Sequence, residues 1–212
     1  MAGPLDAITA IHNAFRRDMQ GIDAAAAAAA RGEPGREADL ERYRYCQQVL
    51  ATHAHGEEIA IFPLVEQVAP LVAEAYEKDH RALDAAFNAL DEAVGAGDVL
   101  ATARAAHAFR YFLDVHLDKE DTHLYRVVRE RVPVPDQGRA VGIMAGEIPP
   151  ERQPAFIAWL FPLIGDDDRE NKLRIFQTVL PPETFAGVSR IAHQAVGEGW
   201  AELRRRMPEL PA

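Results

Sequence analysis

Two short segments of the sequence carry the same pair of metal-binding side chains. His53 precedes Glu57 by four residues, and His116 precedes Glu120 by the same interval. Four residues are just over one helical turn, so on a helix the two side chains of each pair project from one face, about 6 Å apart along the axis. Imidazole nitrogen and carboxylate oxygen both bind divalent transition metals. Each pair is therefore predicted to hold one side of a metal site.

Two further histidines, His12 and His80, extend this pattern. A histidine and a glutamate four residues apart also form ordinary hydrogen bonds on helix surfaces, so one such pair is weak support for a metal. A single histidine on a helix is more often structural than a ligand. Two pairs combined with two additional histidines are far more specific, provided that four helices bring them to one place.

Glycine and proline divide a sequence that is otherwise rich in helix-forming residues, and strand-like alternation is almost absent. The predicted helices cover residues 5–31, 36–62, 70–95 and 99–131. Pro63 is expected to kink or end the second helix, and Asp98 is expected to cap the fourth. Because the connections are short, the predicted fold is all-α, an antiparallel up-down-up-down four-helix bundle.

The positions of the histidines along these helices agree with antiparallel pairing. His12 lies near the start of the first predicted helix, and His53 lies near the end of the second. His80 and His116 lie at heights along their helices that agree only approximately. Small offsets between the two helices can compensate for this difference.

A second region is expected after residue 138. The fourth predicted helix stops before the proline-rich segment 133–138, and shorter helical pieces follow. We interpret residues 139–212 as a helical C-terminal extension. Its apolar residues could pack on the bundle, on a second copy of the chain or around a small core of their own.

The histidine and glutamate pattern resembles the hemerythrin family, specifically its bacterial HHE cation-binding branch. The segment HAHGEEIAIFP at residues 53–63 is especially similar to the second-helix signature of that family. The resemblance covers roughly residues 5–131 and implies a hemerythrin-like domain over residues 1–132. It also implies two oxo- or hydroxo-bridged irons, with Glu57 and Glu120 bridging them. The implied metal ligands are His12, His53, Glu57, His80, His116 and Glu120.

This chain departs from the oxygen-carrying members of the family on the third helix. Those members have two histidines four residues apart, whereas here His80 has Tyr76 four residues before it and Asp84 four residues after it. A smaller ligand set leaves open positions on the metals, which favours direct binding of a small molecule. Glu58 or Asp84 could fill a gap. His123 could lie near the site, although a solvated or indirect role is favoured, and the same ligand set would also accept zinc.

The predicted function is a di-iron protein that binds or reacts with O2, H2O2 or NO, and the sequence does not decide whether it is an enzyme. The alternative is an iron- or oxygen-sensing module that signals through its C-terminal helices. A ferritin-like carboxylate oxidase is disfavoured, because in that group Glu typically precedes His by three residues. Here His precedes Glu by four.

Composition excludes several other classes of protein. The 212 residues are 48% hydrophobic and carry a formal net charge of −10, which is typical of a soluble globular protein and disfavours nucleic-acid binding. Cys46 is the single cysteine, and neither a secretory signal nor a long apolar run is present, so we expect a cytoplasmic protein without a membrane anchor. Whether the chain forms a homodimer is left open.

Overall fold

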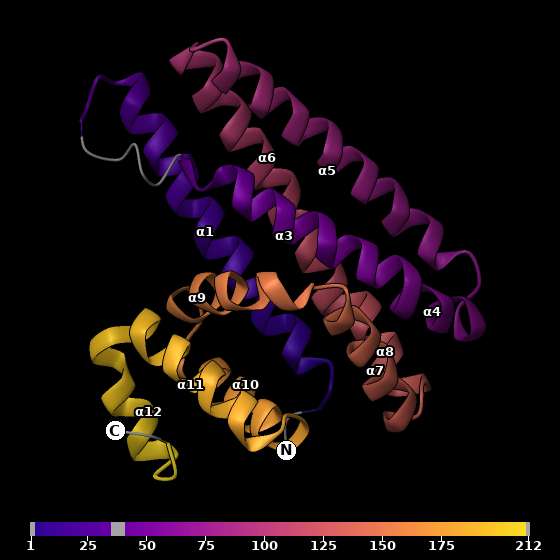
Figure 1. The fold of residues 1–212 in the computed structure, drawn as a ribbon. Helices are drawn as coiled ribbons and strands as arrows, with labels where there is room; N and C mark the ends of the chain where they lie inside the picture. Colours follow the sequence, from indigo (N-terminus) through magenta and orange to yellow (C-terminus); the bar gives the residue numbers. More distant parts are fainter. Residues whose placement is uncertain (1–2, 35–40, 211–212) are drawn as a thin grey trace. The chain divides into compact units, whose positions relative to one another are not determined.

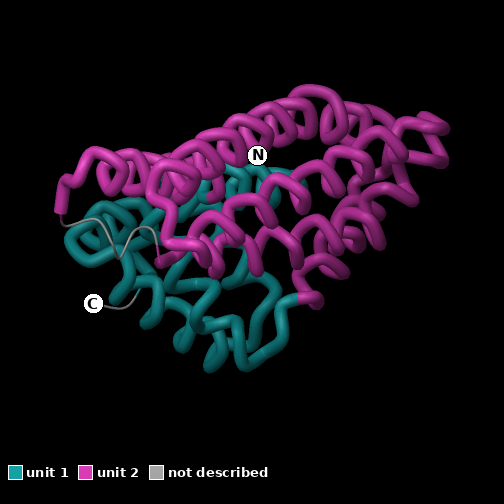
Figure 2. The backbone as a smooth tube through the Cα atoms, turned by 90° about the horizontal axis from the view of Figure 1, so that it is seen from above, with its two compact units in different colours: residues 1–14, 148–212 teal, residues 15–147 magenta. Residues whose placement is uncertain are grey.

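The computed structural model describes residues 3–34 and 41–210, and within those ranges the chain forms helices and no strand. The predicted all-α class is therefore confirmed (Figure 1). Two compact units are present, one formed by residues 15–147 and the other by residues 3–14 with 148–210 (Figure 2). The domain division predicted from the sequence, 1–132 and 139–212, stays a prediction.

The helices that carry the histidine and glutamate pattern each bury one stripe of residues spaced three or four apart. This spacing is the signature of a helix with a single apolar face, which packing against neighbouring helices buries. The buried stripes contain residues 5, 8, 12, 15, 19, 22 and 26 of α1 (Asp6–Ala30) and its first turn, 43, 46, 50 and 53 of α3 (Tyr43–Gly56), 73, 76, 80, 83, 87 and 90 of α5 (Val72–Gly95), and 102, 106, 109, 113 and 116 of α6 (Val99–Lys119). Each stripe thus contains one of the four predicted histidine ligands.

The helices begin and end close to the glycine, proline and capping residues from which their bounds were predicted. The side chain of Asp98 accepts hydrogen bonds from the backbone N–H groups of Leu100 and Ala101, which confirms its predicted role as the cap of α6. A three-residue turn joins α5 to α6, and the two helices pack against each other as a hairpin. The predicted start of the second helix near residue 36 lies outside the described residues.

Two π-helical turns interrupt the long helices, and the sequence did not predict them. The turn η1 (Glu57–Ile61) joins α3 to α4 (Phe62–Val68), and the turn η2 (Glu120–Leu124) joins α6 to α7 (Tyr125–Arg131). The backbone N–H of the residue after each turn donates to the carbonyl of the glutamate five residues earlier, as a π-helix requires.

The wider turn η1 also changes the expected effect of Pro63. Proline was expected to kink or end the second helix, but helical structure continues through α4 to Val68, with the proline in the first turn of α4. The turn η2 contains no proline. Proline is therefore not the common cause of the two π-turns, which instead share a predicted glutamate ligand as their first residue.

The proline-rich segment 133–138, before which the fourth predicted helix stops, begins α8 (Val134–Gly146). Pro135 sits in the first turn of α8, where a missing N–H costs no helical hydrogen bond. Helix α8 packs against α3 and η1. A Cβ atom built on Gly56 would lie 3.1 Å from the side chain of Met144, so a larger residue at position 56 would push α8 away.

The other compact unit contains four α-helices of the C-terminal region, within the described residues. They are α9 (Gln153–Leu163), α10 (Asp166–Val179), α11 (Pro182–Val196) and α12 (Trp200–Arg206). Helix α9 packs against α11, and α10 packs against α12. The bulky side chains of Phe156, Trp159 and Phe161 are buried, which gives this region an apolar core. The helical character predicted for the extension is therefore observed.

The described parts of the chain, residues 3–34 and 41–210, contain no helix that combines the length and apolar character needed to cross a membrane.

Candidate metal centre

Five of the six predicted ligands lie in the unit formed by residues 15–147, and all five are buried. Glu57 and Glu120 are 0% exposed, and the exposure of His53, His80 and His116 is 7% or less. Burial of two carboxylates is unfavourable unless a cation or hydrogen bonds compensate for the loss of water. The sixth residue, His12, is fully buried on the part of α1 that belongs to the other unit, and its place at the centre stays a prediction.

The buried ligands form two overlapping groups around the same two glutamates. Glu57, His80, His116 and Glu120 each offer one donor atom, and these atoms all lie within 4.8 Å of one another. Donor atoms of His53, Glu57 and Glu120 meet the same distance limit. Because both groups include both glutamates, the arrangement suits carboxylates that are shared between two cations.

Both of the His-to-Glu pairs make the contact that their spacing predicts. His53 Nε2 lies 3.3 Å from Glu57 Oε1, and His116 Nε2 lies 3.2 Å from Glu120 Oε1. His80 Nε2 lies between the two pairs, 3.4 Å from Glu57 Oε2 and 3.9 Å from Glu120 Oε1. The ring nitrogens therefore converge on the carboxylates from three helices.

The electrostatics of this cluster favour a positive charge among the ligands. Burial alone would lower the pKa of His80, but the neighbouring carboxylates of Glu120 and Glu57 outweigh burial and raise the pKa to about 11. Burial, and then the charge of Glu57, raise the pKa of Glu120 well above its ordinary value. In the absence of a metal, a proton on the imidazole or on the carboxylate therefore supplies the missing positive charge.

The donor set fits a borderline transition-metal cation. Imidazole nitrogen and carboxylate oxygen suit iron and zinc, whereas a soft metal would favour thiolate. The single cysteine, Cys46, belongs to neither ligand group. The buried residues present therefore fit the metal that the resemblance implied.

Two further carboxylates lie near the other ring nitrogens of His80 and His116. Glu58 Oε1 lies 2.8 Å from His80 Nδ1, and Asp79 Oδ2 lies 3.6 Å from His116 Nδ1. Lys119 also contacts Asp79. A carboxylate that is hydrogen-bonded to the far nitrogen fixes the ring and directs its other nitrogen toward the metal, as Glu58 can do for His80. Asp79 is beyond hydrogen-bond distance of His116 Nδ1 and acts on that ring through its charge. The sequence raised Glu58 only as an additional ligand and missed Asp79, although both residues directly follow or precede a predicted ligand.

The π-turns bring an aromatic side chain to the centre five residues after each glutamate. Phe62 follows Glu57 by five residues and stacks on His80, with 5.4 Å between the ring centroids. Tyr125 follows Glu120 by five residues, and its hydroxyl donates a hydrogen bond to Glu57. Burial, and then the charge of Glu57, raise the pKa of Tyr125 well above its ordinary value, so the hydroxyl keeps its proton. An α-helical register would have turned both aromatic side chains away.

The same change of register explains why His123 is exposed. Seven residues after His116 is two full α-helical turns, which would return His123 to the buried face. One extra residue in η2 rotates everything after it by about 100°, so Tyr125 and not His123 faces the centre. Neither His123 nor Asp84 belongs to the two ligand groups found among the described residues.

We expect the contact between Glu58 and His80 to control metal affinity. Replacing Glu58 by alanine should weaken metal binding by roughly 10–100-fold, because the His80 ring loses the group that orients it. Glu58→Gln keeps an oxygen acceptor and should recover part of the affinity. Competition with a chelator of known affinity measures both variants. Equal affinity of Glu58→Ala and the unmodified protein would contradict a role for this contact.

Comparison with known proteins agrees with the geometry. A sequence profile of the Hemerythrin HHE cation binding domain matches residues 3–128. The chain is also 23% identical over 149 residues to "Zinc finger protein BRUTUS" of Arabidopsis thaliana, a match that covers 68% of this chain and 12% of that protein. No solved structure matches. Because the family profile covers more than half of its length, the chain belongs to the hemerythrin HHE cation-binding domain family.

Proposed function

We propose that this chain is a non-haem di-iron protein that binds or reacts with a small oxidant, O2, H2O2 or NO. The observation that carries this proposal is the sharing of Glu57 and Glu120 by two groups of buried ligands. Two carboxylates between imidazoles can hold a pair of cations with few residues. Iron at such a centre would supply the redox chemistry that small oxidants require.

His12 completes the proposed ligand set as the partner of His53. It lies one helical turn before Phe15, whose ring contacts the ring of His53 with 5.5 Å between centroids. Residues three apart on a helix lie on the same face, so this contact supports a position of His12 near the centre. The proposed fold around the metals is the antiparallel four-helix bundle predicted from the sequence.

The surroundings of the centre suit a small ligand. A cavity of about 140 Å³ reaches His53, His80 and His116, and its apolar lining includes Leu50 and Phe87. Sites for drug-sized ligands typically have volumes of about 300–1,000 Å³. The cavity therefore favours molecules of a few atoms. The roles of the protein side chains are to hold the imidazoles, to keep bulk water out and to donate the Tyr125 hydrogen to Glu57.

Iron content and the optical spectrum test the proposal. Protein loaded anaerobically with Fe²⁺ and then exposed to oxygen should retain about two irons per chain and develop the charge-transfer bands of a bridged ferric pair. His116→Gln should reduce the iron content, and His55→Gln should not, because His55 is exposed. One iron or fewer in the unmodified protein, or a marked preference for zinc, would count against the proposal.

A further inference from the structure

A cation must cross a buried layer to reach the proposed centre. The side chains of Glu57 and Glu120 are fully enclosed, and His80 is 5% exposed. A metal ion loses most of its hydration shell before it binds such ligands, so a site of this kind needs an entry path.

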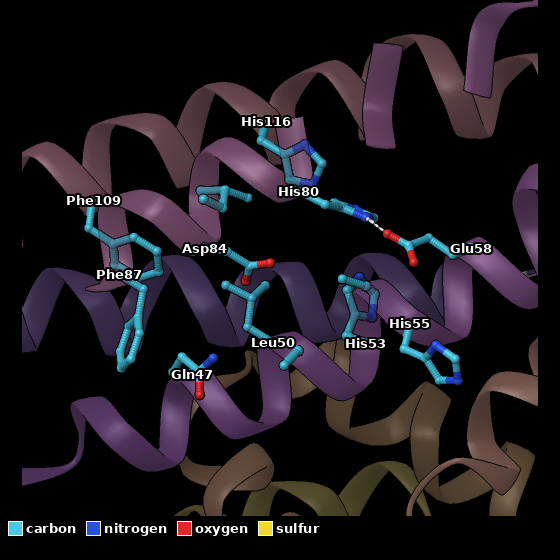
Figure 3. A pocket seen from close by; sticks show the side chains of 13 residues that line it. Gln47, Leu50, His53, His55, Glu58, His80, Asp84, Phe87, Phe109 and His116 are labelled. Atoms are coloured by element: carbon cyan, nitrogen blue, oxygen red, sulfur yellow. Dashed lines mark hydrogen bonds and ion pairs between the residues drawn. The ribbon is translucent and has the colours of Figure 1, made fainter. Parts of the chain in front are cut away.

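A cavity beside the histidines leads toward this centre. It lies between α3, α5 and α6, which all belong to the unit of residues 15–147. Figure 3 shows His53, His80 and His116 on one side of the cavity, with Asp84 and Glu58 also directed toward it. Exposed side chains thus meet buried ligands along the same cavity wall.

The charges on the cavity wall are suited to a cation. Glu58 and Asp84 are the acidic residues of the lining, and the lining contains no lysine or arginine. Both acidic side chains are exposed. The charge of His80, which shares this lining, is offset by Glu58 at 2.8 Å, so Asp84 gives the wall a net negative charge. A concave surface with a net charge of one sign raises the local concentration of the opposite charge. The wall therefore attracts divalent cations and disfavours anions.

No interaction among the described residues gives the Asp84 carboxylate a structural role. Across residues 3–34 and 41–210, no side chain forms an ion pair or hydrogen bond with it. Glu58, by contrast, holds His80 Nδ1 at 2.8 Å. Asp84 lies four residues after His80 on α5, which places it about 6 Å further along the helix axis on the same face. It is thus one turn from a predicted ligand, at the edge of the cavity.

We propose that this cavity is the route by which divalent cations enter the His/Glu centre, and that Asp84 attracts the cation on its way to His80. This inference rests on the proposed metal-binding role of the centre, whichever metal occupies it. It assigns Asp84 to the entry path and not to the ligand set. A residue of the path changes the rates of binding and release together, whereas a ligand changes the equilibrium affinity.

Uptake of Co²⁺ and Zn²⁺ by the metal-free full-length protein tests the assignment. Stopped-flow absorbance follows Co²⁺ directly, and a competing dye reports Zn²⁺. At an ionic strength of about 0.01 M, where screening extends to about 30 Å, Asp84→Asn should slow uptake by about 3–10-fold. At about 1 M salt the difference should vanish, since the screening length falls to about 3 Å. Release should slow by a similar factor, which leaves Kd within about threefold.

Glu77→Gln is the matched control, because it removes one carboxylate from the same helix outside the cavity lining. It should leave the uptake rate unchanged. Normal uptake by Asp84→Asn at low salt would overturn the inference while leaving the metal site intact. A loss of affinity of 10-fold or more with an unchanged uptake rate would also overturn it, because Asp84 would then be a ligand. If the unmodified protein takes up neither cation, both this inference and the proposed function fail.

Discussion

Replacing Glu120 by glutamine should stabilise the metal-free protein and weaken the metal-loaded one. Without a metal, Glu120 is fully buried beside Glu57, and burial followed by the charge of Glu57 raises its pKa well above the ordinary value. An acid with a raised folded pKa opposes folding above its unfolded pKa of 4.5. Glutamine removes this penalty and keeps the side-chain volume.

The expected gain for the metal-free protein at pH 7 is on the order of 1 kcal/mol, the usual size of the effect of a single substitution. The loss of a charged partner for His80 and His116 keeps the gain small. For the metal-loaded protein the sign reverses, because a shared carboxylate ligand becomes a neutral amide. We expect metal affinity to fall by at least about 100-fold, more than the loss typical of an indirect contact.

Urea unfolding in the presence of a chelator, and again with saturating metal, measures both effects. Glu77→Gln serves as the control, since a partly exposed carboxylate away from the centre should change stability by less than about 0.5 kcal/mol in either state. A Glu120→Gln variant that is less stable without metal would show that the carboxylate is a structural hydrogen-bonding group. Unchanged metal affinity would show that it is not a ligand.

The helices that carry the centre could be predicted because each depends on local signals. The cap Asp98 and the glycines around residue 96 mark where α5 ends and α6 begins. The spacing of His53 to Glu57 and of His116 to Glu120 is a property of any helix, and both contacts are observed. Local sequence therefore predicted the elements and the pairs that they carry.

The side chains around the ligands could not be predicted, because they depend on a change of helical register. A π-turn is less favourable than an α-turn in isolation, so packing between helices and not local preference selects it. Spacing in units of an ordinary helix consequently allowed a position of His123 near the centre, although a solvated or indirect role was favoured, and left the positions of Phe62 and Tyr125 undefined. The contact of Asp79 with His116 joins α5 to α6 and has no signature within either helix. Spacing within one helix therefore cannot predict which side chains a neighbouring helix brings to the centre.

Metal binding should release protons, and the apparent affinity should rise steeply with pH. His80 has a pKa of about 11, because the neighbouring carboxylates of Glu120 and Glu57 outweigh the effect of burial. A ligand nitrogen must be unprotonated, so a cation displaces this proton. At pH 7 we expect release of about one proton from His80, whereas a histidine with an ordinary pKa near 6.5 would release roughly a quarter of one.

The same linkage sets the sign of two pH dependences. Because the folded pKa of His80 is above its unfolded value of 6.5, the metal-free protein gains stability from this proton below pH 6.5 and loses it as the pH rises through 11. Metal affinity changes in the opposite direction, increasing by about tenfold per pH unit for each proton displaced. Rising pH therefore destabilises the empty centre and favours the occupied one.

Calorimetric titration with Zn²⁺ in two buffers of different ionisation enthalpy counts the released protons. His55→Gln is the matched control, because this exposed histidine lies on the same helix as His53 and contacts Glu147 instead of the centre. The control should release as many protons as the unmodified protein, and His80→Gln should release about one fewer. Release of a quarter of a proton or less by the unmodified protein would show that Glu57 and Glu120 do not hold His80 in its protonated form. A group other than His80 would then have to balance the charge of the two carboxylates. The cost of burying these carboxylates would in that case no longer explain why a cation binds between them.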